Sequence, residues 1–213
     1  MYVGTGRFLG LSDISDTSQQ SFYGVVDRLN TATFANPRST GSNFVQQTLT
    51  SGQCPPGAPL SVCSPTQTVL TSTANSVNWS TQNGWYIDFV NSGERSFTDP
   101  SLELGTVLFT TIVPSVASED PCAAPGNAYS YIYALNYLTG GAIANSLNVS
   151  GQSLGAGVAT RPVMIELADG TVRSLTRISN GQQTSSDPLV KNVNVSVGSN
   201  GLRRVSWREL TTQ

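Results

Sequence analysis

The clearest hydrophobic pattern in the chain lies between residues 83 and 141. It contains an aromatic run at Gly84–Phe89, an alternation of polar and apolar residues at Glu94–Asp99, and an apolar run at Thr106–Val113. Another aromatic run follows at Tyr129–Leu135. Short runs of β-branched and aromatic residues without a helical period predict the strands of an antiparallel sheet. The unbroken run at Thr106–Val113 predicts a strand that is covered on both faces.

Two hairpins are predicted nearer the C-terminal end. Asp169-Gly170 separates Pro162–Leu167 from Thr171–Leu175, and an Asp-Gly pair between alternating strands is a strong hairpin signal. A turn containing two glycines separates Lys191–Val197 from Leu202–Leu210 in the same way. No stretch of the chain predicts a helix or a heptad repeat.

The regions 31–82 and 142–160 have weaker patterns, and we interpret them as irregular, insert-like parts. Short strands are expected at Phe44–Leu49 and Thr68–Ser72 inside the first of these regions. Ser115–Asn127 contains two prolines and a glycine and predicts a long loop. Long loops on rigid scaffolds often carry binding sites.

A strand-loop-strand outline occurs twice in the chain. Met1–Gly6 resembles Thr106–Thr111, and Ser21–Asp27 resembles Ser130–Asn136. A recurring unit of this kind in an all-β chain predicts a propeller or a solenoid, whose small sheets must stack to bury their faces. A full ring of typical blades needs more residues than this chain has, so we expect a sector of a larger ring.

Several uncommon strings follow one another in a fixed order. They are Met1–Gly10, Ser12–Gly24, Gly84–Asp88, Ser92–Arg95, Thr98–Pro100, Phe109–Thr111, Pro114, Asp120–Cys122, Leu138–Gly141 and Leu202–Leu210. In this order they resemble the propeller of the PilY family, which comprises type IV pilus biogenesis proteins and tip-associated adhesins. The resemblance spans nearly the whole chain. It implies the C-terminal sector of a quinoprotein-like β-propeller with antiparallel blades.

The resemblance also implies a location and partners. A protein of this family is expected to be secreted to the bacterial cell surface, at the pilus tip or in association with the outer membrane. Minor pilins or other tip components are the expected partners, and a host or abiotic surface is the expected ligand. Family members can carry a calcium loop in which acidic residues alternate. No string of this form occurs here, so calcium is expected in the parent protein at most, and no cofactor is expected in this chain.

The composition is typical of an exported β-protein. Only 11% of the residues are charged, against about 25% in an average soluble domain. The 213 residues predict one domain, spanning residues 1–213. A net charge of -2 gives no reason to expect nucleic acid or an anionic membrane as partner. No apolar run approaches the roughly 18 residues of a spanning helix, and Met1 leads into a strand without the pattern of a signal peptide.

The cysteines suggest an oxidising compartment. Cys54 and Cys63 bracket a proline-rich loop, and a disulfide that closes so short a loop would add roughly 2–3 kcal/mol of stability. We expect this disulfide because exported proteins form such bonds, and two free thiols are the alternative. Cys122 then remains, either paired with a cysteine outside this chain or buried as a thiol.

The chain offers little catalytic chemistry. It contains no histidine, which excludes the catalytic triads that depend on that residue. Asp13 and Asp16 lie among hydroxyl residues at a spacing that could hold Ca²⁺. Such residues more often bond their own backbone in turns, and Glu119-Asp120 has the same two interpretations. We therefore assign no catalytic, cofactor-binding or metal-binding residue and expect no enzyme activity.

Three classes of function are consistent with these patterns. The first is a non-enzymatic interaction module that supports pilus biogenesis and surface adhesion. The second is a fragment of a quinoprotein-like dehydrogenase propeller, whose chemistry needs acidic calcium ligands and a carboxylate base that we cannot assign. The third is a glycan-binding surface protein, in which Trp79, Trp85 or Trp207 would stack on sugars. Tryptophan in propellers more often packs between blades, so we expect these residues in the core.

Overall fold

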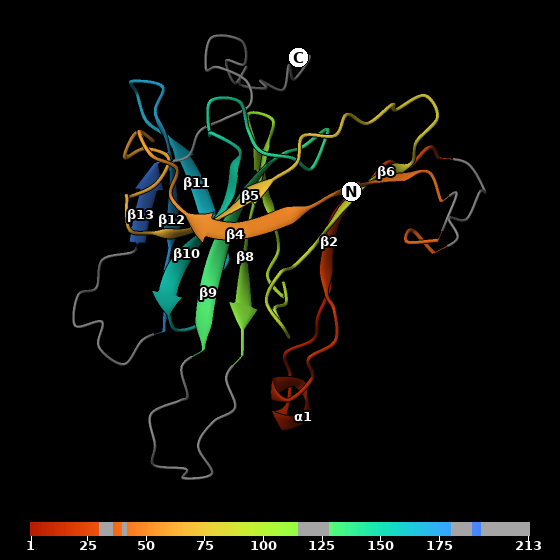
Figure 1. Cartoon of the computed structure of the whole chain (residues 1–213), viewed down its shortest axis with the longest axis horizontal. Coiled ribbons are helices and arrows are strands. Elements are labelled where there is room, and N and C mark those ends of the chain that lie inside the picture. Colours follow the sequence, from red (N-terminus) through yellow and green to blue (C-terminus); the bar gives the residue numbers. More distant parts are fainter. Residues whose placement is uncertain (30–35, 40–41, 115–127, 180–188, 193–213) are drawn as a thin grey trace, which may run out of the picture.

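The computed structural model describes residues 1–29, 36–39, 42–114, 128–179 and 189–192, and its regular structure is almost entirely β (Figure 1). The prediction of an all-β chain is confirmed. One unpredicted helical turn, α1 (Leu11–Ile14), follows the first strand. The strands are β1 (Tyr2–Gly4), β2 (Ser21–Val25), β3 (Phe44–Gln47), β4 (Leu49–Gln53), β5 (Thr68–Ser72), β6 (Gly84–Asp88), β7 (Ser101–Glu103), β8 (Thr106–Val113), β9 (Tyr129–Asn136), β10 (Val149–Ala156), β11 (Val163–Glu166), β12 (Val172–Thr176) and β13 (Leu189–Asn192).

These strands form three sheets. The four-stranded sheet has the order β1-β2-β6-β3, the six-stranded sheet the order β4-β5-β10-β9-β8-β7, and the three-stranded sheet the order β11-β12-β13. β3 and β6 run parallel, and the other pairs are antiparallel. Within the described residues the sheets do not close into a ring, so the predicted propeller is not confirmed.

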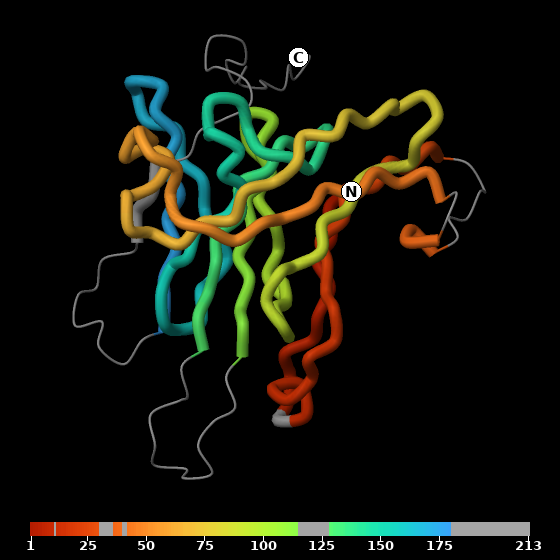
Figure 2. Tube along the Cα trace, in the orientation of Figure 1, coloured from red at the N-terminus to blue at the C-terminus, as the bar shows by residue number. Residues whose placement is uncertain are grey.

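One extended segment joins the two larger sheets. β3 belongs to the four-stranded sheet and β4 to the six-stranded sheet, and Thr48 alone separates them (Figure 2, orange). Gln47 is fully buried at the crossing, and its Nε2 donates to the backbone oxygens of Asn75 and Thr139 at 2.6 and 2.8 Å. Its Oε1 accepts from Thr73 Oγ1 at 2.7 Å. The buried amide is therefore satisfied at both ends and fixes the crossing.

The main core lies between the four-stranded and six-stranded sheets. The rings of Phe22 and Phe109 stack with centroids 3.8 Å apart, and the rings of Phe109 and Tyr133 with centroids 4.9 Å apart. Trp85 is fully buried, and its Nε1 donates to the backbone oxygen of Tyr137 at 3.1 Å. Stacked aromatic rings bury large areas in a defined geometry. The expectation that Trp85 packs in the core is confirmed.

Two glycines leave room for the indole of Trp85. A Cβ atom at Gly24 would lie 2.3 Å from the ring, and one at Gly140 would lie 2.2 Å from it. Gly140 also has a φ of +71°, a conformation that side-chain-bearing residues rarely adopt. The packing of Trp85 therefore explains Gly140, whereas a Cβ at Gly141 would lie 2.8 Å from the backbone oxygen of Thr73.

The opposite face of the six-stranded sheet is covered by the residues that lead to the three-stranded sheet. Thr110 Oγ1 donates to the backbone oxygen of Thr160 at 3.1 Å. Ser130 Oγ donates to the oxygen of Gly157 at 2.8 Å and accepts from the amide of Ala159 at 3.0 Å. β8 thus lies between two layers with all of its residues buried, which confirms the prediction from its apolar run.

The strands of the stretch 83–141 do not lie in one antiparallel sheet, contrary to the prediction from its four runs. β6 pairs with β2 and β3 in the four-stranded sheet, whereas β8 and β9 pair in the six-stranded sheet. The strand predicted at Glu94–Asp99 is wrong, because only Arg95 pairs there, in an isolated bridge with Ile112. The alternation misled us because Glu94, Arg95 and Ser96 are all buried, so polarity does not mark a solvent-exposed face here.

Regular strands also lie in the two regions that we interpreted as irregular. β3, β4 and β5 fall within 31–82, and β10 falls within 142–160, between β5 and β9. β5 coincides with the strand predicted at Thr68–Ser72, whereas Phe44–Leu49 covers β3 and the first residue of β4. β10 has register shifts against both neighbours and contains two glycines, which explains its weak pattern.

The hairpin predicted around Asp169-Gly170 is confirmed. β11 pairs with β12 from Glu166 opposite Val172 onwards. Gly170 has a φ of +80°, and Asp169 Oδ1 accepts from the amide of Thr171 at 2.8 Å. The first strand of the predicted second hairpin begins within β13, at Lys191 and Asn192, and the rest of that hairpin lies outside the described residues. The loop Ser115–Asn127, Glu119, Asp120, Cys122 and Trp207 also lie outside them.

Candidate functional site

Glu94, Arg95 and Ser96 form a joint between the two larger sheets. The backbone of Arg95 exchanges two hydrogen bonds of 2.9 Å with Ile112 of β8. The amide of Ser96 donates at 3.0 Å to the oxygen of Thr5, directly after β1. We call these three residues the Glu94–Ser96 joint. It connects the edge of the six-stranded sheet with the first strand of the four-stranded sheet.

Three side chains donate hydrogen bonds to the carboxylate of Glu94. Oε1 accepts from the hydroxyls of Thr111 and Tyr133 at 2.6 Å each, and Oε2 accepts from Asn91 Nδ2 at 2.7 Å. Glu94 is only 1% exposed. Burial raises the pKa of the Glu94 carboxyl because it disfavours the charged form, and the hydrogen bonds offset this effect only in part.

The side chain of Arg95 binds three backbone oxygens. Its Nε donates to Gly93 at 2.9 Å, Nη1 to Arg7 at 2.7 Å, and Nη2 to Asp16 at 2.5 Å. The planar guanidinium presents its donors in a wide, fixed fork that spans acceptors lying apart, whereas an ammonium group concentrates its three donors on one nitrogen. Because Arg7 and Asp16 flank α1, Arg95 fixes the whole α1 segment to the joint.

The buried polar groups of the Glu94–Ser96 joint stabilise the contact between the two sheets and do not contact a substrate. Glu94 and Arg95 are both 1% exposed, so neither is open to a bound molecule. Their polar atoms bond other groups of the protein, as buried charged groups must if the fold is to be stable. The string Ser92–Arg95, which contributed to the family resemblance, therefore marks a packing requirement.

Asp13 and Asp16 have local partners that explain their presence. Asp13 Oδ2 accepts from the amides of Leu9 and Gly10 at 2.7 and 3.0 Å, and Oδ1 accepts from Arg7 Nε at 3.1 Å. These bonds lower the pKa of the Asp13 carboxyl. Asp16 Oδ1 accepts from the amide of Ser18 at 2.9 Å, which likewise lowers its pKa. Across the described ranges, no three His, Cys, Asp or Glu residues gather as a metal site would require.

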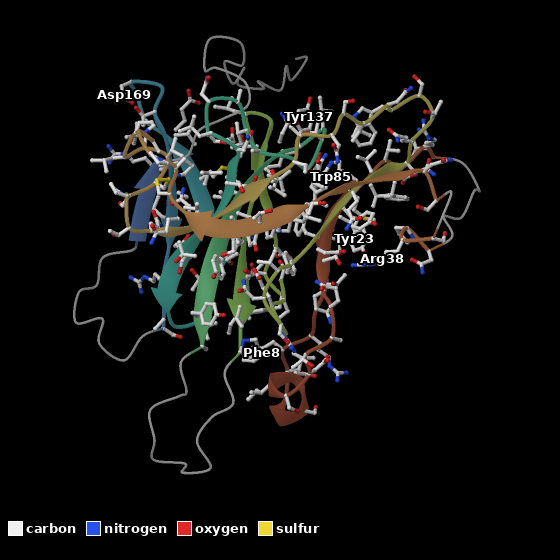
Figure 3. All side chains as sticks on the ribbon, in the orientation of Figure 1. Phe8, Tyr23, Arg38, Trp85, Tyr137 and Asp169 are labelled. Atoms are coloured by element: carbon white, nitrogen blue, oxygen red, sulfur yellow. A yellow bond between two sulfur atoms is a disulfide. The ribbon has the colours of Figure 1, made fainter. Side chains whose placement is uncertain are left out.

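A second polar cluster lies on the face of the four-stranded sheet that points away from the core. Asp88 accepts from Ser21 Oγ at 2.7 Å and forms an ion pair with Arg38. Arg38 Nε donates to the hydroxyl of Tyr23 at 3.1 Å, and its guanidinium lies 5.4 Å from the ring centroid of Tyr86 (Figure 3). No sequence pattern indicated this cluster, because 50 residues separate Arg38 from Asp88.

Two grooves open beside β1. The first has a volume of about 410 Å³ and lies between Tyr2–Gly4 and Ser96–Pro100, with the rings of Phe8 and Phe97 5.6 Å apart at its side. The second has a volume of about 480 Å³, and its lining includes Trp79. Further lining residues of the second groove are Tyr2, Asp27, Tyr137 and Leu138. Half-buried aromatic rings beside a carboxylate could contact a sugar.

Cys54 and Cys63 are joined by a disulfide, with their Cα atoms 5.8 Å apart. Both cysteines are buried and pack against Val62, Val69 and Val149. The bond therefore fastens the proline-rich loop to the end of the six-stranded sheet. No helix in the described part of the chain is long and apolar enough to cross a membrane.

The chain is similar to two curated proteins from Xylella fastidiosa (strain Temecula1 / ATCC 700964), and each of them is described as a type IV pilus biogenesis factor PilY1 homolog. The first is 27% identical over 154 residues, covering 70% of this chain and 9% of the relative. The second is 26% identical over 236 residues, covering 99% of this chain and 16% of the relative. No family model matches the chain.

The fold is similar to the crystal structure of the Pseudomonas aeruginosa PilY1 C-terminal domain, with a TM-score of 0.58 and 22% identity. The predicted resemblance to the PilY-family C-terminal domain is confirmed. The match covers 90% of this chain but only 41% of the solved PilY1 chain. The chain also spans less than a fifth of the length of either curated relative.

Proposed function

We propose that this chain is a non-enzymatic interaction module of a type IV pilus biogenesis protein and that it supports surface adhesion. The observation that carries this proposal is the alignment with a PilY1 homolog over 99% of the chain. The similarity of fold to the PilY1 C-terminal domain supports the same assignment. The location that follows is the bacterial cell surface, at the pilus tip or in association with the outer membrane. A disulfide suits this location.

In this proposal the chain is one β-domain, spanning residues 1–213, that acts as the C-terminal sector of a β-propeller. The four-stranded and six-stranded sheets stack over one shared core, and the residues that lead to the three-stranded sheet cover the other face of the six-stranded sheet (Figure 1). A ring of such sheets would bury the two faces that remain at the ends of the series. The solved relative supports a larger domain, since this chain matches only 41% of it.

Two observations support a role without catalysis. The sequence has no histidine, and Glu94, the buried acid whose pKa is raised, is enclosed by protein groups. An interaction module instead needs a rigid scaffold with exposed loops and edges. The partners in this proposal are minor pilins or other components of the pilus tip, and the ligand is a host or abiotic surface.

Cells that make the full-length protein allow a direct test. Deleting the region of residues 1–213 should reduce piliation or attachment while the amount of pilin stays the same. A point variant tests the contribution of the fold without removing the domain. Gly140→Ala should weaken the packing around Trp85, whereas the control Gly52→Ala has open space around its new methyl group and should leave the fold unchanged. Normal pili and normal adhesion after the deletion would contradict the proposal.

A second function, glycan binding, is favoured by the groove that contains Trp79. Tyr137 and Asp27 line the same groove, and this combination offers both a stacking surface and a hydrogen-bond acceptor for a pyranose ring. Binding to a glycan array that is lost in Trp79→Ala but kept in Phe97→Ala would support this function. Phe97 is a suitable control because it is a partly exposed aromatic residue of the other groove.

A further inference from the structure

The groove that contains Trp79 combines aromatic rings with one charged side chain. Its volume is about 480 Å³, and its aromatic walls come from Tyr2, Trp79 and Tyr137. All three rings are partly exposed and pack against the main core. Among the described residues that line this groove, Asp27 alone has a charged side chain. A ligand in the groove therefore meets aromatic faces and a carboxylate.

The carboxylate of Asp27 is exposed but held in place. Its Oδ1 accepts from the amide of Leu29 at 2.8 Å. A carboxylate offers about four lone-pair sites, so capacity for a ligand remains beyond this bond. The neighbouring Arg28 does not line the groove, and its Nη2 donates to the backbone oxygens of Trp79 and Gln82 at 2.8 and 3.0 Å. Arg28 thus fixes the segment that carries Trp79 and leaves the groove to the negative charge.

The groups around the groove are better supplied with acceptors than with donors. The backbone amides of four lining residues already donate to acceptors inside the protein, at 2.8 to 3.1 Å; they are Val25, Val26, Tyr137 and Leu138. The hydroxyl of Tyr2 donates to the backbone oxygen of Tyr137 at 3.1 Å. Burial and then the neighbouring Tyr137 raise the pKa of Tyr2, so its proton stays in this bond. Its lone pairs and the Asp27 carboxylate can accept from a ligand.

This balance selects among sugars. A protonated amino group brings three donors and a positive charge, which suit both a carboxylate and the faces of aromatic rings. An N-acetyl group replaces that charge with a carbonyl group that needs a donor, and an acidic sugar adds a negative charge beside Asp27. The apolar face of the sugar ring can stack on Trp79 in each case. The amino group therefore decides the preference.

We propose that this groove binds glycans that carry a free, protonated amino group, with the amine at Asp27 and the sugar ring stacked on Trp79. The inference rests on the second function proposed above, glycan binding, and names the class of sugar. Because Asp27 is exposed, water and salt weaken its attraction for the amine. The preference over an N-acetylated sugar is therefore expected to be about fivefold in Kd.

Two oligosaccharides that differ only at the nitrogen test this preference. They are chitohexaose, which is N-acetylated on every sugar, and its fully deacetylated counterpart. Each is titrated calorimetrically into the purified chain in mildly acidic buffer, in which the amines are protonated. A glycine–serine leader ahead of Met1 makes its nitrogen an uncharged amide that does not compete for Asp27. The deacetylated oligomer should bind about fivefold more tightly, salt should reduce the difference, and Trp79→Ala should bind neither oligomer.

A pair of matched variants assigns the preference to the groove. Asp27→Asn removes the charge, while the asparagine oxygen can still accept from the amide of Leu29. It should bind the two oligomers equally. Asp99→Asn removes an exposed carboxylate from the other groove and should keep the preference. Loss of the preference in both variants would overturn the assignment to Asp27, because the overall charge of the protein would then account for it.

The outcomes also separate this inference from glycan binding itself. Equal binding of the two oligomers by the wild type, abolished in Trp79→Ala, would support glycan binding but overturn the preference for amines. Binding of neither oligomer overturns the inference, and the glycan array then decides the glycan function separately. Hexalysine that binds as tightly as the deacetylated oligomer would also overturn it, because the groove would then recognise any cation and not a sugar.

Discussion

The hydroxyl of Tyr133 donates a hydrogen bond of 2.6 Å to the buried carboxylate of Glu94, at the point where the two larger sheets meet. The pKa of Tyr133 is raised well above its ordinary value, mainly by burial and then by the neighbouring Glu94 charge. The pKa of Glu94 is also raised, with burial as the main cause. Both shifts disfavour the charged form of the buried group, so folded Glu94 holds its proton to a higher pH than an exposed glutamate does.

This relationship predicts a pH dependence of stability. Because the folded protein holds the Glu94 proton more tightly than the unfolded chain, the proton stabilises the fold. This contribution is fully present below the ordinary pKa of 4.5 and is lost as the pH rises through the raised pKa of folded Glu94. Urea unfolding at a series of pH values should show a fall in the free energy of unfolding across this window, and Glu94→Gln should lack that fall.

The variant also serves to separate Glu94 from the other acids. Asp13, Asp16 and Asp169 have lowered pKa values, so the stability that they contribute is present above the ordinary Asp pKa and is lost as the pH falls. These aspartates therefore make the protein more stable as the pH rises, which is the opposite of the effect of Glu94. Their contribution is the same in the wild type and in Glu94→Gln. Parallel curves for wild type and Glu94→Gln would contradict the role assigned to Glu94.

Arg95 gives a second prediction. Arg95→Lys keeps the charge but cannot reach the oxygens of Gly93, Arg7 and Asp16 together. Buried carbonyl groups would lose their partner, and we expect a loss of roughly 2–4 kcal/mol in the free energy of unfolding. Urea denaturation measures this loss.

Arg7→Gln is the matched control for Arg95→Lys. It removes an ion pair to Asp13 from a side chain that is 70% exposed, while the backbone oxygen that Arg95 binds remains. Surface pairs of this kind contribute less than about 1 kcal/mol. Equal losses in the two variants would show that the three-carbonyl contact of Arg95 does not stabilise the joint.

The sequence was sufficient for those elements whose pattern has a local cause. The run Thr106–Val113 predicted a doubly covered strand, and Asp169-Gly170 predicted a hairpin, because burial and turn chemistry act within a few residues. The tryptophan in Gly84–Asp88 was correctly expected in the core.

The sequence was insufficient wherever distant segments decide the environment. The polarity of Glu94 suggested a surface strand, but its partners Thr111 and Tyr133 come from two other strands. Which sheet β6 joins depends on β2 and β3, far along the chain, and no local pattern specifies that choice. The Asp88 cluster was missed for the same reason, since Arg38 lies in a region with little pattern of its own.

Gly140 provides a third prediction. Gly140→Ala would place a methyl group 2.2 Å from the indole of Trp85 and would hold alanine at a φ of +71°. Steric overlap and backbone strain both oppose it, so we expect a loss of roughly 2 kcal/mol or more. The thermal midpoint and the near-ultraviolet circular dichroism of Trp85 would report the change. Gly52→Ala, with nothing near its new Cβ, should leave both signals almost unchanged.

The disulfide gives the last prediction. Peptide mapping without reductant should recover Cys54 linked to Cys63, and a link to Cys122 or two free thiols would contradict this pairing. The bond closes a loop with a sequence separation of 9, for which the chain-entropy model gives roughly 2–3 kcal/mol. Reduction of the wild-type protein should lower the free energy of unfolding by that amount. The double variant Cys54→Ala/Cys63→Ala should start from the lower value and should not respond to reductant, because it lacks the bond that the reductant breaks. A response of the double variant to reductant would show that another disulfide contributes to stability.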